Sequence, residues 1–174
     1  MNLIKEIWNQ QSTVQSRLFL AKLKEKLIER YTCDWLNKIV YYIDRFAFYS
    51  KIKQERKLET YFTYIDKNIF RDMFVRFRFG VTDIATHKGR YSNIDLSCPL
   101  CKNHIENEVH FVIDCPYYDD LRRMLLRLEP DEPGEVSLVN IITSDNVHTL
   151  RNFAMYIYYA LKRRNNLLDE HTSS

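Results

Sequence analysis

The chain has 174 residues but few glycines and prolines, three and four respectively. These residues supply the tight turns of β-sandwiches and barrels and the glycine-rich loops that hold phosphates, so their scarcity favours helices. No stretch free of Asp, Glu, Lys and Arg exceeds about ten residues, whereas a membrane-spanning helix needs about 20 apolar residues. The sequence therefore predicts no contact with the membrane interior.

The N-terminal segment also lacks the features of a secretory signal. It opens with Lys5 and Glu6 close to Met1 and has no apolar central run. Hydrophobic residues make up 45% of the chain, which is enough to build a core. We expect an intracellular protein, nuclear or cytoplasmic, whose cysteines are reduced.

The formal net charge of +3 conceals an asymmetry. Residues 1–97 carry 18 basic and 11 acidic residues, a charge of +7, while residues 98–174 carry 8 basic and 12 acidic residues, a charge of −4. A basic half can face a polyanion such as a nucleic acid, although a modest charge excess also keeps ordinary helical proteins in solution.

Apolar residues recur at intervals of three and four along most of the chain, which is typical of amphipathic helices. We expect helices over about 13–31, 34–49 and 60–80, the first two separated near Tyr31 to Cys33, and Gly80 ending the third. After the acidic linker Pro130 to Gly134, we expect helices over 136–142 and 146–168.

This pattern predicts a mostly α protein, a helical bundle with an inserted small zinc knuckle. It divides into a helical region at 1–80, a connector and zinc knuckle at 81–116, and C-terminal helices at 117–174.

Three of the four cysteines fall within 18 residues and, with a histidine, give the spacing C-x2-C-x8-H-x4-C. Two thiolates separated by two residues can approach one ion from a tight turn, and a second close pair completes a tetrahedron of sulfur and nitrogen ligands around zinc. The predicted ligands are Cys98, Cys101, His110 and Cys115. A disulfide is the alternative, but it suits a small secreted chain.

His104 competes with His110 for the fourth ligand position. We favour His110 because apolar neighbours in Val109 to Ile113 can shelter the site, whereas His104 stands in a polar loop. With four protein ligands no position remains for a catalytic water, so we expect one structural zinc per chain.

The residues around the cluster resemble a known family. The segments concerned are Gly89-Arg90-Tyr91, Cys98-Pro99-Leu100-Cys101, Glu108-Val109-His110-Phe111 and Cys115-Pro116-Tyr117-Tyr118-Asp119-Asp120-Leu121-Arg122. They resemble the zinc-binding knuckle in the C-terminal region of non-LTR (LINE-type) retrotransposon reverse transcriptases. The resemblance covers about Phe77 to Arg123, and the flanking helices are similar in character only. It implies a region that binds template RNA or target DNA, with the polymerase and nuclease activities located elsewhere.

Tyr117-Tyr118-Asp119-Asp120 matches the Y-x-D-D pattern of a reverse-transcriptase active site, where paired carboxylates hold two metal ions. That chemistry needs a hairpin between apolar strands and a further carboxylate, but here the pattern follows a zinc cysteine and opens a helix. Asp119 and Asp120 are expected to complement the helix dipole. We therefore expect no catalysis, since the chain has no room for a polymerase core.

Basic and aromatic residues alternate before the cysteine cluster, which suits phosphate pairing combined with base stacking. The predicted nucleic-acid contacts are Arg76, Arg78, Lys88 and Arg90, placed outside the apolar stripe of their helix. The run Lys162 to Arg164 is expected to complement the end of the last helix instead. Cys33 is expected to pack in a helical core.

Two functions from different classes remain. The first is a zinc-knuckle module that binds RNA or DNA. The second is a helical protein-interaction domain in which zinc staples a loop and an aromatic surface binds a protein partner. Salt-dependent retention on nucleic acid separates them.

Overall fold

The computed structural model describes residues 16–41, 43–53, 58–128 and 133–172. These residues are mostly helical, which confirms the predicted all-α class. Within these ranges the β-structure is limited to one isolated antiparallel bridge, between Ser97 and Ile105. None of the helices in this part of the chain combines the length and the apolar character needed to cross a bilayer.

The chain forms two compact units, Met1–Ile43 and Asp44–Ser174. The described part of the first unit is the single helix α2 (Ser16–Tyr41), which runs without a break through Thr32 and Cys33. The predicted separation near Tyr31 to Cys33 is therefore wrong. Thr32 Oγ1 donates to the carbonyl of Ile28 four residues earlier, at 2.7 Å, and no Gly or Pro interrupts the segment.

Cys33 lies exposed on α2 and is not in a helical core, contrary to expectation. Its Sγ accepts a hydrogen bond from Asn37 Nδ2 at 3.6 Å. Several large apolar side chains of the same helix are exposed as well, among them Leu20, Leu27 and Val40.

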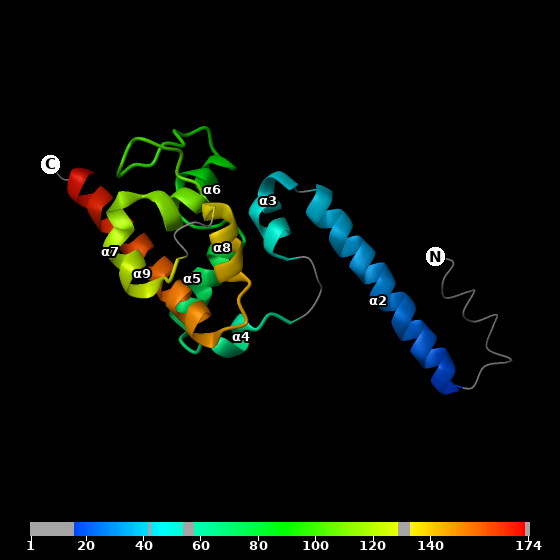
Figure 1. Cartoon of the computed structure of the whole chain (residues 1–174). Coiled ribbons are helices and arrows are strands. Elements are labelled where there is room, and N and C mark those ends of the chain that lie inside the picture. The colour runs from blue at the N-terminus through cyan, green and yellow to red at the C-terminus, as the bar shows by residue number, and fades with distance from the viewer. Residues whose placement is uncertain (1–15, 42, 54–57, 129–132, 173–174) are drawn as a thin grey trace. The chain divides into compact units, whose positions relative to one another are not determined.

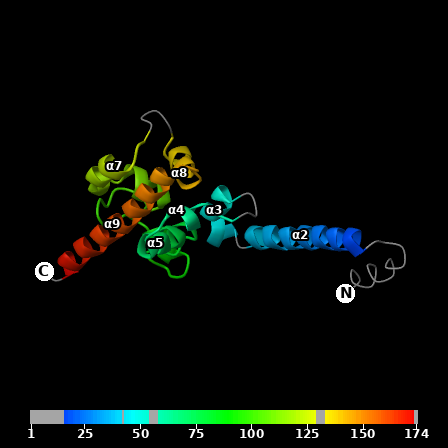
Figure 2. The ribbon, with the colours of Figure 1, turned by 90° about the horizontal axis from the view of Figure 1, so that it is seen from below.

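The second unit is built around α9 (Val147–Thr172). Figure 1 shows the other elements arranged about this helix, and Figure 2 shows α7 and α8 on one side of it with α4 and α5 on the other. The elements that precede it are α3 (Ile43–Ile52), α4 (Tyr61–Tyr64), α5 (Asn68–Arg78), α6 (Ala85–Gly89), the π-helical turn η2 (His110–Asp114), the 3₁₀ turn η3 (Pro116–Tyr118), α7 (Asp119–Leu125) and α8 (Gly134–Ile142).

The helix predicted over 60–80 is divided into α4 and α5. Between them Ile65 and Lys67 have extended backbone angles, with ψ of 97° and 118°. Arg151 of α9 uses the break, because its Nε donates to the freed carbonyl of Tyr64 at 2.6 Å. Arg71 of α5 also donates to the carbonyls of Phe62 and Ile65, at 3.3 and 3.2 Å, so both a distant and a nearby arginine satisfy the carbonyls at the break.

The two C-terminal helices agree with prediction within a few residues. α8 begins at Gly134 and ends at Ile142, and α9 extends past the predicted end at Leu168 to Thr172. Asn146 caps α9, since its Oδ1 accepts from the backbone N–H groups of His148 and Thr149. The predicted apolar face of α9 is buried, as shown by Leu150, Phe153, Ile157, Ala160 and Leu161.

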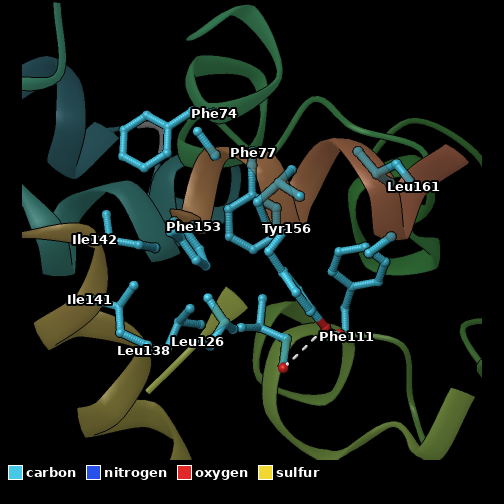
Figure 3. Packing of buried hydrophobic residues seen from close by; sticks show 14 of the residues in the cluster. Phe74, Phe77, Phe111, Leu126, Leu138, Ile141, Ile142, Phe153, Tyr156 and Leu161 are labelled. Carbon is cyan, nitrogen blue, oxygen red and sulfur yellow. Dashed lines mark hydrogen bonds between the residues drawn. The ribbon is translucent and has the colours of Figure 1, made fainter. Parts of the chain in front are cut away.

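Aromatic rings form the centre of the core of the second unit (Figure 3). Phe77 of α5 lies with its ring centroid 5.9 Å from that of Phe153 and 6.2 Å from that of Phe111. Phe111 in turn contacts Tyr156, at 6.4 Å between centroids. Phe77, Phe111 and Tyr156 come from the three regions predicted as 1–80, 81–116 and 117–174, so parts of all three regions share the core of the second unit.

Candidate metal centre

Cys98, Cys101, His110 and Cys115 come together in the second unit. One ligand atom from each residue lies within 4.8 Å of those of the other three. Cys98 Sγ is 3.9 Å from Cys115 Sγ, and Cys101 Sγ is 3.3 Å from His110 Nε2. The four side chains can therefore hold one metal ion.

The first cysteine pair lies on a tight turn, Cys98-Pro99-Leu100-Cys101. The Cys98 sulfur accepts hydrogen bonds from the backbone N–H groups of Leu100 and Cys101. The turn closes where Lys102 N–H donates to the Cys98 carbonyl at 2.9 Å, and Lys102 adopts a left-handed φ of 60°. Backbone donors thus point at the sulfur, which stabilises a thiolate there.

The second pair lies on a widened helical turn. In η2 the N–H of Cys115 donates to the carbonyl of His110 at 2.8 Å, an i to i+5 bond that places the two residues side by side. The N–H of His110 is itself capped by Asn107 Oδ1 at 2.8 Å. This turn explains how a histidine and a cysteine separated by four residues can face the same ion.

Side chains from α7 and α9 hold the widened turn by its carbonyl groups. Tyr156 Oη donates to the carbonyls of Phe111 and Val112, at 2.9 and 3.2 Å (Figure 3). Arg122 donates to the carbonyls of Val112 and Cys115, at 3.3 and 2.6 Å. Both side chains are buried, so the turn that carries His110 and Cys115 is attached to the core by hydrogen bonds that solvent does not reach.

The electrostatics of the cluster favour one thiolate. The hydrogen bond from the Cys115 thiol, together with the backbone donors of Leu100 and Cys101, lowers the pKa of Cys98 to about 4. The pKa of Cys115 is raised, first because it donates that bond to Cys98 and second because it is buried. Without a cation, two neighbouring thiolates would repel each other. A divalent cation at the centre of the cluster would offset that repulsion and stabilise both thiolates.

The donor set and its spacing fit zinc. Tetrahedral coordination with Zn–S bonds of about 2.3 Å places two sulfur ligands about 3.8 Å apart. The separation of 3.9 Å between Cys98 and Cys115 sulfurs agrees with that value. Cys98 and Cys115 are fully buried, and His110 nearly so, which suits a closed structural site.

His104 stands beside the cluster without joining it. Its ring centroid is 5.4 Å from that of His110, and its side chain is exposed. The His104 carbonyl accepts from the Cys98 N–H at 2.7 Å, which helps to shape the first turn. The structure thus groups His110, the predicted ligand, with the cysteines.

The four predicted nucleic-acid contacts do not form one surface. Arg76 and Lys88 are exposed, and Lys88 pairs with Asp83 at 3.2 Å. Arg78 is 2% exposed and its Nη2 lies 3.2 Å from Glu59 Oε2, so its predicted place outside the apolar stripe is wrong. Arg78 points inward because α5 continues the helical turn past Phe74 and Phe77, and its guanidinium lies over the rings of Phe74 and Tyr61.

Arg90 is half-buried and its guanidinium is used within the fold. Its Nη2 lies 3.3 Å from Glu108 Oε1, and its Nη1 donates to the Gly80 carbonyl at 3.3 Å. The same Glu108 oxygen lies 3.0 Å from Nε2 of the buried His87. Arg90, which follows α6 directly, therefore links the turn after α5 to the segment that leads into His110.

Two acids near the predicted ligands, Glu106, which is buried, and Glu108, which is partly buried, were not anticipated as structural partners. Glu108, within the segment that carries the family resemblance, binds His87 and Arg90. Glu106 forms a buried pair with Arg164 of α9 and accepts the Ala85 N–H at 2.6 Å.

The run Lys162 to Arg164 lies well before the end of α9 at Thr172, so its predicted role at the helix end is wrong.

The Y-x-D-D segment lies in η3 and the first turn of α7. Tyr118 is buried, and Asp119 and Asp120 occupy the first helical turn, as expected for residues that complement the dipole. Asp119 pairs with Arg122 and Asp120 with Arg163.

Searches of protein-family models, curated proteins and solved structures found no match to this chain.

Proposed function

We propose that this chain is a zinc-knuckle module that binds RNA or DNA without catalysis of its own, and that it corresponds to the region after the polymerase core of a LINE-type reverse transcriptase. The observation that carries the proposal is the convergence of Cys98, Cys101, His110 and Cys115 within 4.8 Å of one another. These ligands lie in the segments that carry the family resemblance.

The metal in this proposal is one structural zinc per chain. Its four ligands all come from the protein, so no coordination position is left for a water that could be activated. Zinc would fix the Cys98 turn against η2 and so orient the exposed residues between them, including Lys102.

The charge distribution supports nucleic acid as the ligand. Residues 1–97 carry the +7 charge, and α2 displays exposed Lys22, Lys24, Lys26 and Arg30. In the second unit the exposed cations include Arg76, Lys88, Lys102 and Lys162. Cations spread over both units can neutralise phosphates without reading a base sequence.

The test measures metal and nucleic acid together. Protein purified without chelator is analysed for zinc by mass spectrometry, and its binding to labelled single-stranded RNA, single-stranded DNA and duplex DNA is followed by anisotropy at about 50 and 200 mM salt. We expect one zinc per chain and an affinity that falls steeply with salt. Zinc-loaded protein that binds none of the three nucleic acids at low salt would overturn the proposal.

A protein-interaction domain is the second candidate, and one observation favours it. Leu20, Leu27 and Val40 of α2 are 61%, 53% and 66% exposed. Several large apolar side chains exposed on one helix are typical of a surface that binds another protein. Binding through such residues is strengthened by sulfate and other kosmotropic salts. Retention of a partner that increases with sulfate, in the absence of nucleic-acid binding, would support this candidate.

A further inference from the structure

A groove lies between α5 and α9 in the second unit, away from the metal ligands. Its volume is about 370 Å³, and its walls include Met73 and Arg76 of α5, Asp83, and Tyr158, Leu161 and Lys162 of α9. α5 and α9 lie side by side along this contact (Figure 2). The volume is at the lower end of the roughly 300–1,000 Å³ typical of small-ligand sites, which suits one nucleotide and not a long segment.

Two cations of this groove are available to a ligand. Arg76 and Lys162 are exposed, and no carboxylate of the described residues lies within ion-pair distance of either. Asp83, the acid in the groove, is held by Lys88 at 3.2 Å and by Asn165. The groove therefore presents two uncompensated positive charges.

An aromatic side chain, Tyr158, lines the same groove as these cations. Tyr158 is half-buried, and the two rings that contact it, Phe70 and Tyr159, approach at interplanar angles of 64° and 76°. Neither neighbour is stacked parallel to the Tyr158 ring. Lys67 Nζ lies 5.5 Å from the centroid of the Phe70 ring, so a third cation lies next to a ring that contacts Tyr158.

We propose that the α5–α9 groove binds one nucleotide of a single-stranded nucleic acid, with its base stacked on Tyr158 and its flanking phosphates on Arg76 and Lys162. The proposal rests on the nucleic-acid-binding function proposed above and assigns a place to it. A single strand is favoured over a duplex because a base must leave its stack to reach an aromatic ring, and stacking on aromatic residues tolerates any base.

The experiment compares zinc-loaded variants by anisotropy with labelled oligo(dT), oligo(U) and duplex DNA. Arg76→Gln with Lys162→Gln removes both groove cations, and Arg123→Gln with Arg127→Gln removes the same charge from exposed positions elsewhere. We expect the groove variant to lose roughly tenfold or more in affinity for the single strands. Its salt slope should fall by about 1.4, because each single-strand phosphate contact contributes about 0.7. The control variant should stay close to the parent.

A second pair of variants tests stacking. Tyr158→Phe keeps the ring and should bind as the parent does, whereas Tyr158→Leu should weaken single-strand binding roughly tenfold with little change in the salt slope. Photo-crosslinking with an oligonucleotide that carries 5-iodouracil should attach to the α9 peptide containing Tyr158. Circular dichroism and zinc content establish that each variant is folded.

The outcomes separate this proposal from the general function. A parent that binds nucleic acid while the groove variant and the control variant behave alike would overturn the groove and leave the function standing. A loss of single-strand affinity in the cation variant, with no such loss in Tyr158→Leu, would overturn base stacking on Tyr158. A parent that binds no nucleic acid would overturn both proposals.

Discussion

The Arg164 guanidinium forms a two-bond ion pair with the Glu106 carboxylate in the interior of the second unit. Arg164 Nε lies 2.7 Å from Glu106 Oε1, and Nη2 lies 2.8 Å from Oε2. The Arg164 side chain is 6% exposed and that of Glu106 is fully buried. The pair joins α9 to the segment between Cys101 and His110, and the additional bond from the Ala85 N–H extends the link to α6.

Breaking this pair from one side should be costly. We expect Glu106→Gln or Arg164→Met to lower the free energy of unfolding by about 3–5 kcal/mol, because each leaves a buried group without its charged partner. The double variant should lose less free energy of unfolding than the two single variants lose together. Urea denaturation of the zinc-loaded protein measures all three.

Asp120→Asn provides the matched control for the buried pair. It removes an ion pair with Arg163 in which the side chains are 59% and 33% exposed. Solvent screens such a pair, so the loss should stay below about 1 kcal/mol. Equal losses in the buried and exposed variants would show that burial of the Glu106 pair has little energetic effect.

The two neighbouring histidines should differ in their effect on metal binding. His110→Ala removes a ligand and should lower zinc affinity by more than the roughly 10- to 100-fold that loss of an outer-shell partner costs. His104→Ala should leave affinity near that of the parent, since the exposed His104 ring lies beside His110 but does not belong to the ligand group, and the carbonyl that accepts from Cys98 is kept in alanine. Competition with a chromogenic chelator measures both. A larger effect from His104 would reassign the ligand.

Arg76 and Arg78 are two residues apart on α5 and differ in burial. We expect Arg78→Met to lower the free energy of unfolding by about 2–3 kcal/mol, because it leaves Glu59 without one of its two cations and removes the hydrogen bond to the Ile142 carbonyl. Arg76→Met should change stability by about 0.5 kcal/mol or less. Thermal and urea unfolding compare the two, and a reversed order would contradict the orientation of α5.

His87 should make stability depend on pH. Burial lowers the pKa of His87, opposed by its hydrogen bond to Glu108, and its Nδ1 accepts from the Thr82 N–H at 3.3 Å, which requires the neutral ring. The unfolded chain therefore binds this proton more readily than the folded protein. The contribution of His87 to the free energy of unfolding is fully present above the pKa that histidine has in the unfolded chain, about 6.5. This contribution is lost as the pH falls below that pKa.

Unfolding of zinc-saturated protein at a series of pH values between neutral and mildly acidic tests this dependence. His87→Gln should flatten the slope, whereas replacement of the exposed His148 by Gln should leave it unchanged. The groups that face His87 are Thr82, Glu106, Glu108 and Arg90, so zinc content is measured at each pH to separate this effect from metal loss. An unchanged slope in His87→Gln would contradict the assignment.

The local patterns predicted the helix whose apolar face is buried, and they were wrong at two boundaries, one predicted inside the continuous helix α2 and one missed between α4 and α5. The apolar face of α9 was predicted because Leu150, Phe153 and Ile157 repeat at helical intervals and pack inward. The break between α4 and α5 was missed, and the Tyr64 carbonyl at this break is bonded by Arg151, which lies more than 80 residues away along the chain. A uniform helical period cannot indicate that contact.

The spacing of the three cysteines and His110 was sufficient to predict the group that could hold a metal ion, because each ligand pair lies on a short local turn. The attachment of the second turn to the core, through Tyr156 and Arg122, was not predictable from that spacing. The roles of the charged residues depended on tertiary structure. Arg78, Arg90 and Arg164 look like surface cations in the sequence, yet each meets an acid from a distant segment, Glu59, Glu108 or Glu106. Whether a cation faces solvent or a buried carboxylate is decided by long-range packing, since the cost of burying its charge is offset only where the fold supplies that partner.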